Sequence, residues 1–271
     1  MESPHAYKLP DGNVLISFSG GRTSGYMLHQ ILEANGSLPT TCRVTFANTG
    51  REAPGTLDFV QECAQRWGIH ITWLEYTRAN NRSAFKTVNH NSAARKGEPF
   101  EELINSRRGY LPNQQARYCT AEMKVLTIKR YLVNEGWTQW ANTVGIRADE
   151  AHRLKQSTDK RWNNWYPLNQ AQATKHTVKA FWGAQPFDLN ITPGHGNCDG
   201  CFLKSEATIA ALFRDMPERM QWWADQEEKV GATFHKRGSY GALAEFVNRQ
   251  QTWLFNDEAF LCQASDGECT G

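Results

Sequence analysis

The sequence predicts an α/β protein in which a parallel twisted sheet is flanked by helices and followed by a helical extension at the C-terminal end. Over the first two thirds of the chain, short β-branched runs alternate with segments of helical periodicity. This alternation favours parallel strands joined by right-handed crossovers. After Ser205 the periodicity stays helical to about Gln251. With 271 residues, the chain can bury such a core without disulfide bonds.

Changes in periodicity set the bounds of each element in order. The predicted strands are Asn13–Phe18, Arg43–Ala47, Ile69–Glu75 and Asn142–Ile146, and the predicted helices are Thr23–Glu33, Pro54–Trp67 and Thr120–Asn134. Residues Thr77 to Gln115 are rich in Asn, Ser, Arg and Lys, so we expect a long loop with one short helix near Phe100–Asn105. We expect the pair Trp222 and Trp223 on the surface of the helical extension.

The charge of the chain is nearly balanced, with 30 Lys and Arg residues, 28 Asp and Glu residues and a formal net charge of +2. This balance points to neither a nucleic-acid nor a membrane partner. Residues Met1 to Gly12 lack the apolar run of a signal peptide, and no later stretch is apolar enough to span a bilayer. We therefore expect a cytoplasmic protein whose seven cysteines are thiols or metal ligands.

Residues Val14 to Gly25 combine an apolar strand, a Ser-Gly-Gly-x-x-Ser turn and the start of a helix. The adjacent Gly20 and Gly21 let the backbone approach an anion, and the amide groups at a helix start direct their positive ends toward it. The turn differs from a Walker A loop because Arg22 lies inside it and the Gly-Lys-Ser/Thr ending is absent. The pattern predicts a phosphate-binding turn, and a strand-to-helix connection without a ligand is the alternative.

Three predicted strands end in segments that are candidates for ligand contact. Ligands of parallel sheets collect beyond the carboxyl ends of the strands. The segments at these ends are Ser19–Ser24, Ala47–Arg51 and Gly145–Arg153. We expect all three to meet at one crevice.

The strongest chemical signal is the motif Cys198-Asp199-Gly200-Cys201. A Cys-x-x-Cys turn that contains glycine directs two thiolates at one centre, as in half-sites for zinc or for an iron–sulfur cluster. A redox dithiol or two unconnected thiols are the alternatives.

Other cysteines could complete this half-site. Cys119 opens a predicted helix, and a helix start favours the thiolate. Cys262 and Cys269, near the end of the chain, are each a candidate for the fourth ligand. Cys42 precedes a strand and Cys63 lies within an amphipathic helix, so we expect both in the core.

Four blocks follow one another along the chain in a specific order. They are Ser19-Gly20-Gly21-Arg22-Thr23-Ser24, Phe46-Ala47-Asn48-Thr49-Gly50, Arg117-Tyr118-Cys119-Thr120-Ala121-Glu122-Met123-Lys124 and Gly145-Ile146-Arg147-Ala148-Asp149-Glu150-Ala151-His152-Arg153. Together they resemble the signature of the phosphoadenosine phosphosulfate (PAPS) reductase family, and the chain looks closest to the branch carried by phages and prophages. The resemblance covers about residues 13 to 204.

The resemblance implies the adenine nucleotide α-hydrolase-like, Rossmann-type fold of the PP-loop superfamily. It implies a PP-loop domain over residues 1–204 and a helical extension over residues 205–271. It also implies that the first block holds the phosphate or sulfate end of an adenine nucleotide, with the second block beside the nucleoside. The residues assigned to the nucleotide in this way are Ser19, Gly20, Gly21, Arg22, Thr23, Ser24, Asn48, Thr49 and Gly145.

Three basic residues match catalytic positions of the family. Arg147 and Arg153 would face the anionic part of the substrate, because a forked guanidinium suits phosphate oxygens. Lys124 is similar to the family lysine of the same block, and an ordinary solvated lysine on a helix is the alternative.

The cysteine pattern resembles that of the cluster-bearing reductases, in which a tandem pair precedes the Cys-x-x-Cys motif. Here Tyr118 and Thr120 flank Cys119, so one cysteine of the tandem pair is missing. The resemblance favours a [4Fe–4S] cluster over zinc, although spacing alone does not separate the two metals. The ligands that it implies are Cys119, Cys198, Cys201 and Cys262.

Two enzymatic functions and one binding function follow from the resemblance. In the first, the protein uses ATP, with Mg as the accompanying ion, to adenylate an acceptor and then transfers sulfur supplied by a cysteine desulfurase. In the second, Cys269 is the nucleophile of a thioredoxin-dependent reductase that acts on adenylyl sulfate (APS) or PAPS. The third is a nucleotide-binding interaction module without turnover.

A nucleic-acid acceptor has support from two segments that interleave basic and aromatic residues. These segments are Arg161–Tyr166 and Lys175–Trp182. Such side chains can contact phosphates and stack on bases. Tryptophans that pack the sheet against the C-terminal helical extension are the alternative.

Overall fold

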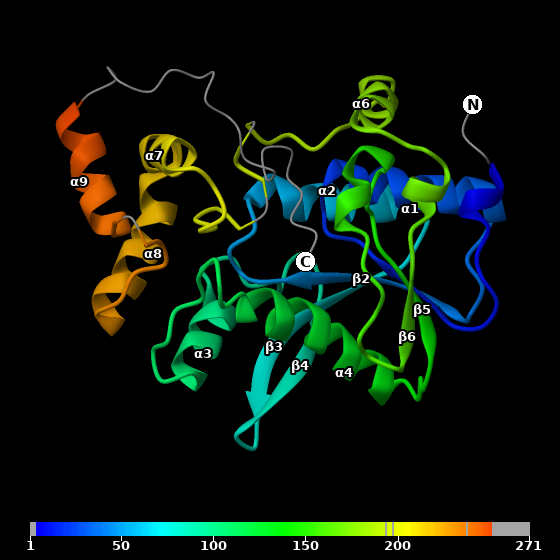
Figure 1. The fold of residues 1–271 in the computed structure, drawn as a ribbon, viewed down its shortest axis with the longest axis horizontal. Coiled ribbons are helices and arrows are strands. Elements are labelled where there is room, and N and C mark those ends of the chain that lie inside the picture. The colour runs from blue at the N-terminus through cyan, green and yellow to red at the C-terminus, as the bar shows by residue number, and fades with distance from the viewer. Residues whose placement is uncertain (1–3, 193, 197, 237, 251–271) are drawn as a thin grey trace.

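The computed structural model describes residues 4–192, 194–196, 198–236 and 238–250, and within them six strands form one twisted sheet (Figure 1). The strand order is β4-β3-β2-β1-β5-β6, and every neighbouring pair is parallel except β3 with β4. The strands are β1 Val14–Ser17, β2 Cys42–Asn48, β3 Ile71–Ala79, β4 Arg82–Val88, β5 Trp140–Thr143 and β6 Trp162–Trp165. The predicted α/β class with a mostly parallel sheet is confirmed.

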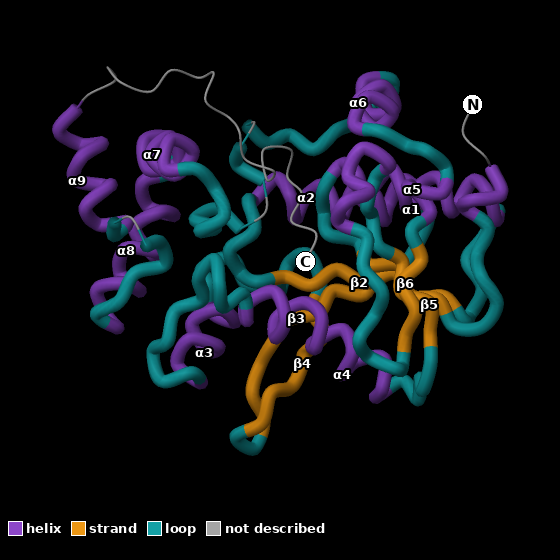
Figure 2. Tube along the Cα trace, viewed as in Figure 1, coloured by secondary structure: helices purple, strands orange, loops and turns teal. Residues whose placement is uncertain are grey.

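Helices cover both faces of this sheet. Figure 2 shows α1, α2 and α6 on one face, α4 on the other, and α7 to α9 gathered beside the sheet. The helical elements are η1 Pro4–Tyr7, α1 Arg22–Asn35, α2 Pro54–Trp67, α3 Glu98–Ser106, η2 Thr120–Leu126, α4 Thr127–Asn134, η3 Ala148–Arg153, α5 Pro167–Gln170, α6 Lys175–Gly183, α7 Glu206–Asp215, α8 Pro217–Val230 and α9 Tyr240–Gln250. In these described parts of the chain, no helix combines the length and apolar character needed to cross a membrane.

Side-chain alternation along the strands gives the sheet two different faces. In β1, Ile16 packs into the core formed with α1 and α2, whereas Leu15 packs with Ile128 and Leu132 of α4. Both faces are therefore buried, which a parallel sheet requires. The face beneath α4 also borders the candidate functional site.

A β-hairpin lies within residues 77–115, where the composition predicts a long loop. The chain leaves β3 through Asn80 and Asn81, whose φ angles are 51° and 59°, and returns as the antiparallel strand β4. Asparagine tolerates this left-handed conformation, so the pair forms a two-residue hairpin turn. The loop prediction was wrong because β4 is a polar edge strand with little apolar alternation. The short helix predicted near Phe100–Asn105 is confirmed as α3.

Two further elements differ from their predicted bounds. The strand predicted at Asn142–Ile146 lies at Trp140–Thr143, because Trp140 pairs with Trp162 of β6, a strand that the sequence pattern did not indicate. The single helix predicted over Thr120–Asn134 divides after Leu126 into a π-helical segment, η2, and the α-helix α4. Departures of this kind are frequent near functional sites.

The C-terminal helices pack around Trp223, which is only 1% exposed. Their hydrophobic cluster continues into Phe100 of α3 and Met123 of η2. The surface position expected for Trp223 was therefore wrong, and Trp222 is partly buried next to it. Phe202 joins the same cluster from the segment before residue 205. The division of the chain after residue 204 stays a prediction.

A buried carboxylate ties α8 to the sheet. Asp199 is 0% exposed and accepts hydrogen bonds from Arg51 Nη2 at 2.8 Å and from Arg219 Nε at 2.8 Å. Trp223 Nε1 donates to its other oxygen at 2.6 Å. Burial lowers the pKa of Arg51, and the negative charge of Asp199 opposes this shift. Because Arg51 follows β2 while Arg219 belongs to α8, this single carboxylate joins the strand end, the Cys-x-x-Cys turn and the helical extension.

We expect Asp199→Asn to destabilise the protein strongly, because it leaves Arg51, itself 3% exposed, without its charged partner. Breaking a buried ion pair in this way costs about 3–5 kcal/mol, measured as a loss in the free energy of unfolding by urea titration. Asp188→Asn is the matched control. Asp188 binds Arg22 through the same paired geometry, but the two side chains are 36% and 32% exposed. Its loss should stay below about 1 kcal/mol. Equal losses in the two variants would contradict the anchoring role of Asp199.

Candidate functional site

The phosphate-type turn is held in shape by its own side chains. Ser24 Oγ accepts a hydrogen bond from Ser19 N at 3.2 Å, lies 2.9 Å from Ser19 Oγ and donates to Gly21 O at 3.0 Å. Helix α1 begins at this turn, and its N-cap, Gly21, provides no side-chain cap. Gly20 has φ +79°, and a Cβ there would lie 2.6 Å from Thr56 Cγ2. Glycine is therefore required at Gly20, and the start of α1 faces the space above the turn.

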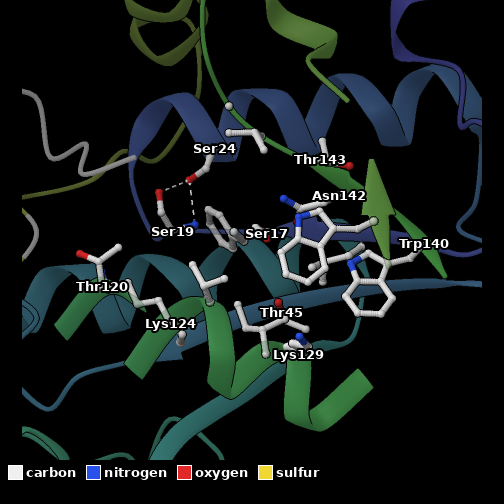
Figure 3. A pocket seen from close by; sticks show the side chains of 18 of the residues that line it. Ser17, Ser19, Ser24, Thr45, Thr120, Lys124, Lys129, Trp140, Asn142 and Thr143 are labelled. Carbon is white, nitrogen blue, oxygen red and sulfur yellow. Dashed lines mark hydrogen bonds between the residues drawn. The ribbon is translucent and has the colours of Figure 1, made fainter. Parts of the chain in front are cut away.

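A cavity begins at this turn and extends between the sheet and the helices η2 and α4 (Figure 3). Ser19 and Ser24 lie at one end of the cavity, and Trp140 and Trp162 lie at the other. Lys124 of η2 also lines it. The open space along the cavity, which includes solvent at its mouth, is about 1050 Å³.

Polar side chains line the sheet side of the cavity, where an apolar surface would be expected beneath a helix. Ser17 of β1, Thr45 of β2 and Asn142 of β5 all belong to this lining (Figure 3). The Thr45 hydroxyl is buried and has no hydrogen-bond partner in the described parts of the chain. These residues were not predicted from the sequence. The available signal was a polar residue inside β2 and β5 and at the end of β1, at positions that alternation assigns to the core.

The predicted basic pair lies beside the turn. Arg147 Nη1 donates to Thr23 Oγ1 at 3.0 Å, and Arg147 Nε donates to Asp149 Oδ1 at 3.1 Å. Arg147 Nη2 lies 3.3 Å from Glu150 Oε2, and Arg153 pairs with the same carboxylate. The structure thus brings Arg147 directly to the phosphate-type turn, and Glu150 links Arg153 to it. Gly145, from the same block, lines the cavity.

Other predicted nucleotide residues lie outside the cavity lining. Arg22 forms a paired ion contact with Asp188, with Nε–Oδ1 at 2.7 Å. Asn48 is 0% exposed, and its amide donates to Glu75 Oε1 at 2.6 Å. Thr49 lies close to Cys198 instead, with Oγ1 and Sγ 3.3 Å apart.

A charged cluster connects the cavity to the cysteines. Lys124 Nζ lies 3.4 Å from Glu52 Oε1, and the Glu52 side chain is 1% exposed. The Thr49 hydroxyl donates to this same oxygen at 3.2 Å, and Cys198 Sγ lies 3.9 Å from it. Burial, reinforced by the charge of Glu52, raises the pKa of the Cys198 thiol, and Lys124 opposes this shift. Burial and the charge of Glu52 both favour the protonated form of this thiol. The sequence analysis did not single out Glu52.

The three predicted metal ligands with described positions are only partly brought together. A charge on Cys119 is near enough to contribute to the raised pKa of Cys198. Cys201 N donates to Cys198 O at 3.2 Å, which closes the turn. The Cys201 thiol lies near Tyr240, whose pKa is raised by burial and by the charge of Cys201. Cys262 and Cys269 lie outside the described residues.

Within the ranges described above, no group of three or more His, Cys, Asp or Glu side chains is placed to hold a metal ion. The [4Fe–4S] cluster and zinc stay predictions, because the predicted ligand Cys262 lies outside the described residues. Cys42 and Cys63 are 7% and 0% exposed, so their predicted core positions are confirmed.

The two basic and aromatic segments contribute their tryptophans largely to packing. Trp162 stacks on Trp140 with ring centroids 5.3 Å apart and planes inclined by 20°. Trp182 is 2% exposed in the core beside α1, and Trp165 packs against the same core. These tryptophans pack against the sheet, as the alternative expects, but in clusters with α1, α2 and α4 rather than with the C-terminal helices. A nucleic-acid acceptor stays a prediction.

Comparison with protein families identifies one match. The family model for the phosphoadenosine phosphosulfate reductase domain matches residues 13–175. The uncharacterized nin region protein ORF290 of Escherichia phage lambda is 30% identical over 208 residues, which are 74% of this chain and 69% of that protein.

Two solved structures show more distant likeness. One is the phosphoadenylyl-sulfate (PAPS) reductase from Candida auris in a phosphate complex, at 18% identity and a TM-score of 0.43, covering 69% of this chain and 82% of that one. The other is the U34-tRNA thiolase NcsA from Methanococcus maripaludis with its [4Fe-4S] cluster, at 14% identity and a TM-score of 0.44, covering 98% and 84%. Because the family model spans more than half of the sequence and the phage relative is matched over most of its length, the chain belongs to the phosphoadenosine phosphosulfate reductase family of the PP-loop superfamily.

Proposed function

We propose that this protein is an enzyme that binds an adenine nucleotide in the cavity beneath η2 and α4, with the phosphate or sulfate end at Ser19–Ser24. One observation carries the proposal. A single cavity is lined both by the turn, which offers hydroxyl groups and the start of a helix, and by the side chain of Lys124. An anion at the turn is favoured by the positive end of α1. Membership of a family named for an enzyme supports turnover rather than binding alone.

The favoured reaction is ATP-dependent adenylation followed by sulfur transfer. An acceptor oxygen attacks the α-phosphorus, the bond to the bridging oxygen breaks, and pyrophosphate leaves with the electron pair. A sulfur nucleophile then displaces AMP from the acceptor. In this proposal Lys124 stabilises the negative charge that builds up on the α-phosphate oxygens, and Arg147 orients the phosphate chain from the side of Thr23. Mg would accompany the nucleotide, a cysteine desulfurase would supply the sulfur, and a nucleic acid is one candidate acceptor.

The second candidate is reduction of a sulfonucleotide, which the family model favours. A thiolate attacks the sulfur of APS or PAPS, the sulfur–oxygen bond breaks and the nucleotide leaves. Thioredoxin then reduces the resulting thiosulfonate and releases sulfite. Cys269, the candidate nucleophile, lies outside the described residues. No step of either reaction is assigned to a metal.

The two reactions have different products, so one set of incubations separates them. Purified protein is incubated with ATP and candidate acceptors, and separately with APS or PAPS and reduced thioredoxin. We expect pyrophosphate release that depends on both ATP and acceptor. Sulfite release would instead support the reductase. If neither nucleotide is consumed while ATP stays bound and intact for hours, the protein is a binding module and the enzymatic proposal fails.

Ser24→Ala tests the phosphate turn. The variant loses a hydroxyl that organises the turn and can bind an anionic oxygen, so we expect the Kd for ATP to rise about 10-fold or more in calorimetric titrations. Ser106→Ala is the matched control, because Ser106 Oγ also donates to a backbone carbonyl, Leu103 O at 2.7 Å, but lies outside the cavity lining. An unchanged Kd in a folded Ser24→Ala protein would argue against binding at this turn.

The predicted cluster is tested by anaerobic purification with iron and sulfide counted per chain. We expect brown protein with visible absorbance, and loss of both colour and iron in Cys198→Ala. Cys63→Ala should keep the colour, since Cys63 lies in the apolar core away from the Cys-x-x-Cys turn. Wild-type protein without iron or sulfide would remove the cluster from the proposed function and leave the nucleotide site standing.

A further inference from the structure

Two buried threonines on central strands have hydroxyls without a hydrogen-bond partner among the described residues, and they lie on opposite faces of the sheet. Thr45 and Thr143 are both 0% exposed, and both Oγ1 atoms are unpartnered. Thr45 is in register with Ser17, whereas Thr143 is in register with Ile16. Because Ile16 and Ser17 are successive residues of β1, their side chains point to opposite faces. Figure 3 shows Thr143 toward α1 and Thr45 toward η2 and α4.

Thr143 also borders the cavity, but its side chain points to the face of the sheet that α1 covers, so its hydroxyl is not directed at a ligand on the side of η2 and α4. Thr45 differs in its surroundings, because it shares the cavity floor with two other polar side chains, Ser17 and Asn142. The apolar residues Leu15 and Leu74 belong to the cluster on this face, so the polar row interrupts a hydrophobic surface. Buried polar atoms in proteins nearly always have partners, and a bound molecule could provide the one that Thr45 lacks.

The two ends of the cavity have different chemistry. At one end lie the hydroxyls of Ser19 and Ser24 and the start of α1. At the other, Trp140 stacks with Trp162, and Lys129 Nζ lies 5.5 Å from the Trp162 ring centroid. The first end suits an anion, and the second suits a planar apolar group. Thr45 lies between the two ends of the cavity (Figure 3). A planar group that extends from the anionic end would bring its polar edge close to Thr45.

We propose that Thr45 determines nucleobase specificity: its hydroxyl hydrogen-bonds the polar edge of a purine that enters between the sheet and η2–α4. This inference rests on the proposed function, because it requires a nucleotide with its phosphates at the turn. Thr45 acts on recognition and takes no part in bond making or breaking. On binding, the base loses hydrogen bonds to water and gains one to the Thr45 hydroxyl. That hydroxyl gives up no bond to the protein, because it has none among the described residues.

The test compares Thr45→Val with Thr143→Val. Both substitutions replace a buried unpartnered hydroxyl by a methyl group of similar shape, so neither should lower the melting temperature. Binding of ATP and of GTP is measured by calorimetry for each protein. We expect Thr45→Val to raise the Kd for ATP about 10-fold and to reduce the preference for ATP over GTP by a similar factor. Thr143→Val should bind both nucleotides as the wild type does.

Two further variants keep the outcome interpretable. Thr45→Ser retains the hydroxyl and should keep most of the affinity and the preference for ATP. Thr45→Ala removes the hydroxyl without adding bulk and replaces Thr45→Val if that protein does not fold. Wild-type protein that binds no adenine nucleotide overturns the proposed function together with this inference. Wild-type binding with an unchanged ATP preference in Thr45→Val or Thr45→Ala overturns the inference alone.

Discussion

The arrangement of the cysteines depends on the carboxylate of Asp199. This side chain lies within the Cys-x-x-Cys motif, yet it points into the protein and binds two guanidinium groups and an indole. A buried pair of this kind contributes to a unique arrangement more than to net stability, because desolvation offsets much of the attraction. Its geometric effect is that the turn bearing Cys198 and Cys201 is fixed to the end of β2. The helical extension is thereby part of the site's scaffold, although none of the residues that the structure describes in it lines the cavity.

The segment that follows β2 also links the cavity to the Cys198 thiol. Glu52 follows β2, is almost fully buried and interacts with Lys124 on the cavity side and with Cys198 on the other. A negative charge at this place favours protonation of the thiol and holds the lysine at the cavity wall. A nucleotide bound near Lys124 would compete with Glu52 for the ammonium group. The electrostatic state of Cys198 is thus connected to occupancy of the cavity through one carboxylate.

The sequence was sufficient to predict the class of fold, the strand-to-helix turn at Ser19–Ser24 and the core positions of Cys42 and Cys63, because each has a strong local signal. Alternating apolar runs identified β1, β2 and β3, and two adjacent glycines identified the turn. Local patterns did not reveal β4, because it has the polar pattern of an edge strand. They also did not reveal that Trp140 and Trp162 belong to the sheet, because this depends on the pairing of the two residues with each other.

The candidate site was predictable only where its residues form contiguous motifs. Arg147 was found from its block, and it does contact the turn through Thr23. Arg22 lies in the turn itself but turns away to Asp188, a partner far along the chain that no local pattern indicates. Glu52 and Thr45 are notable because they are polar and buried. Burial depends on the tertiary structure, so the sequence around them does not reveal it. A polar residue in an apolar strand was the one signal available for Thr45.

The internal hydrogen bonds of the Ser19–Ser24 turn have a consequence for how a ligand would be received. Because Ser24 already engages both the amide and the hydroxyl of Ser19, the loop has its curved shape before any anion arrives. Association then requires only an exchange of bonding partners, and the chain loses little additional conformational entropy. Preorganisation of this kind lets a small loop discriminate by shape among tetrahedral oxyanions, since it does not readily remodel to accept a poorly fitting one.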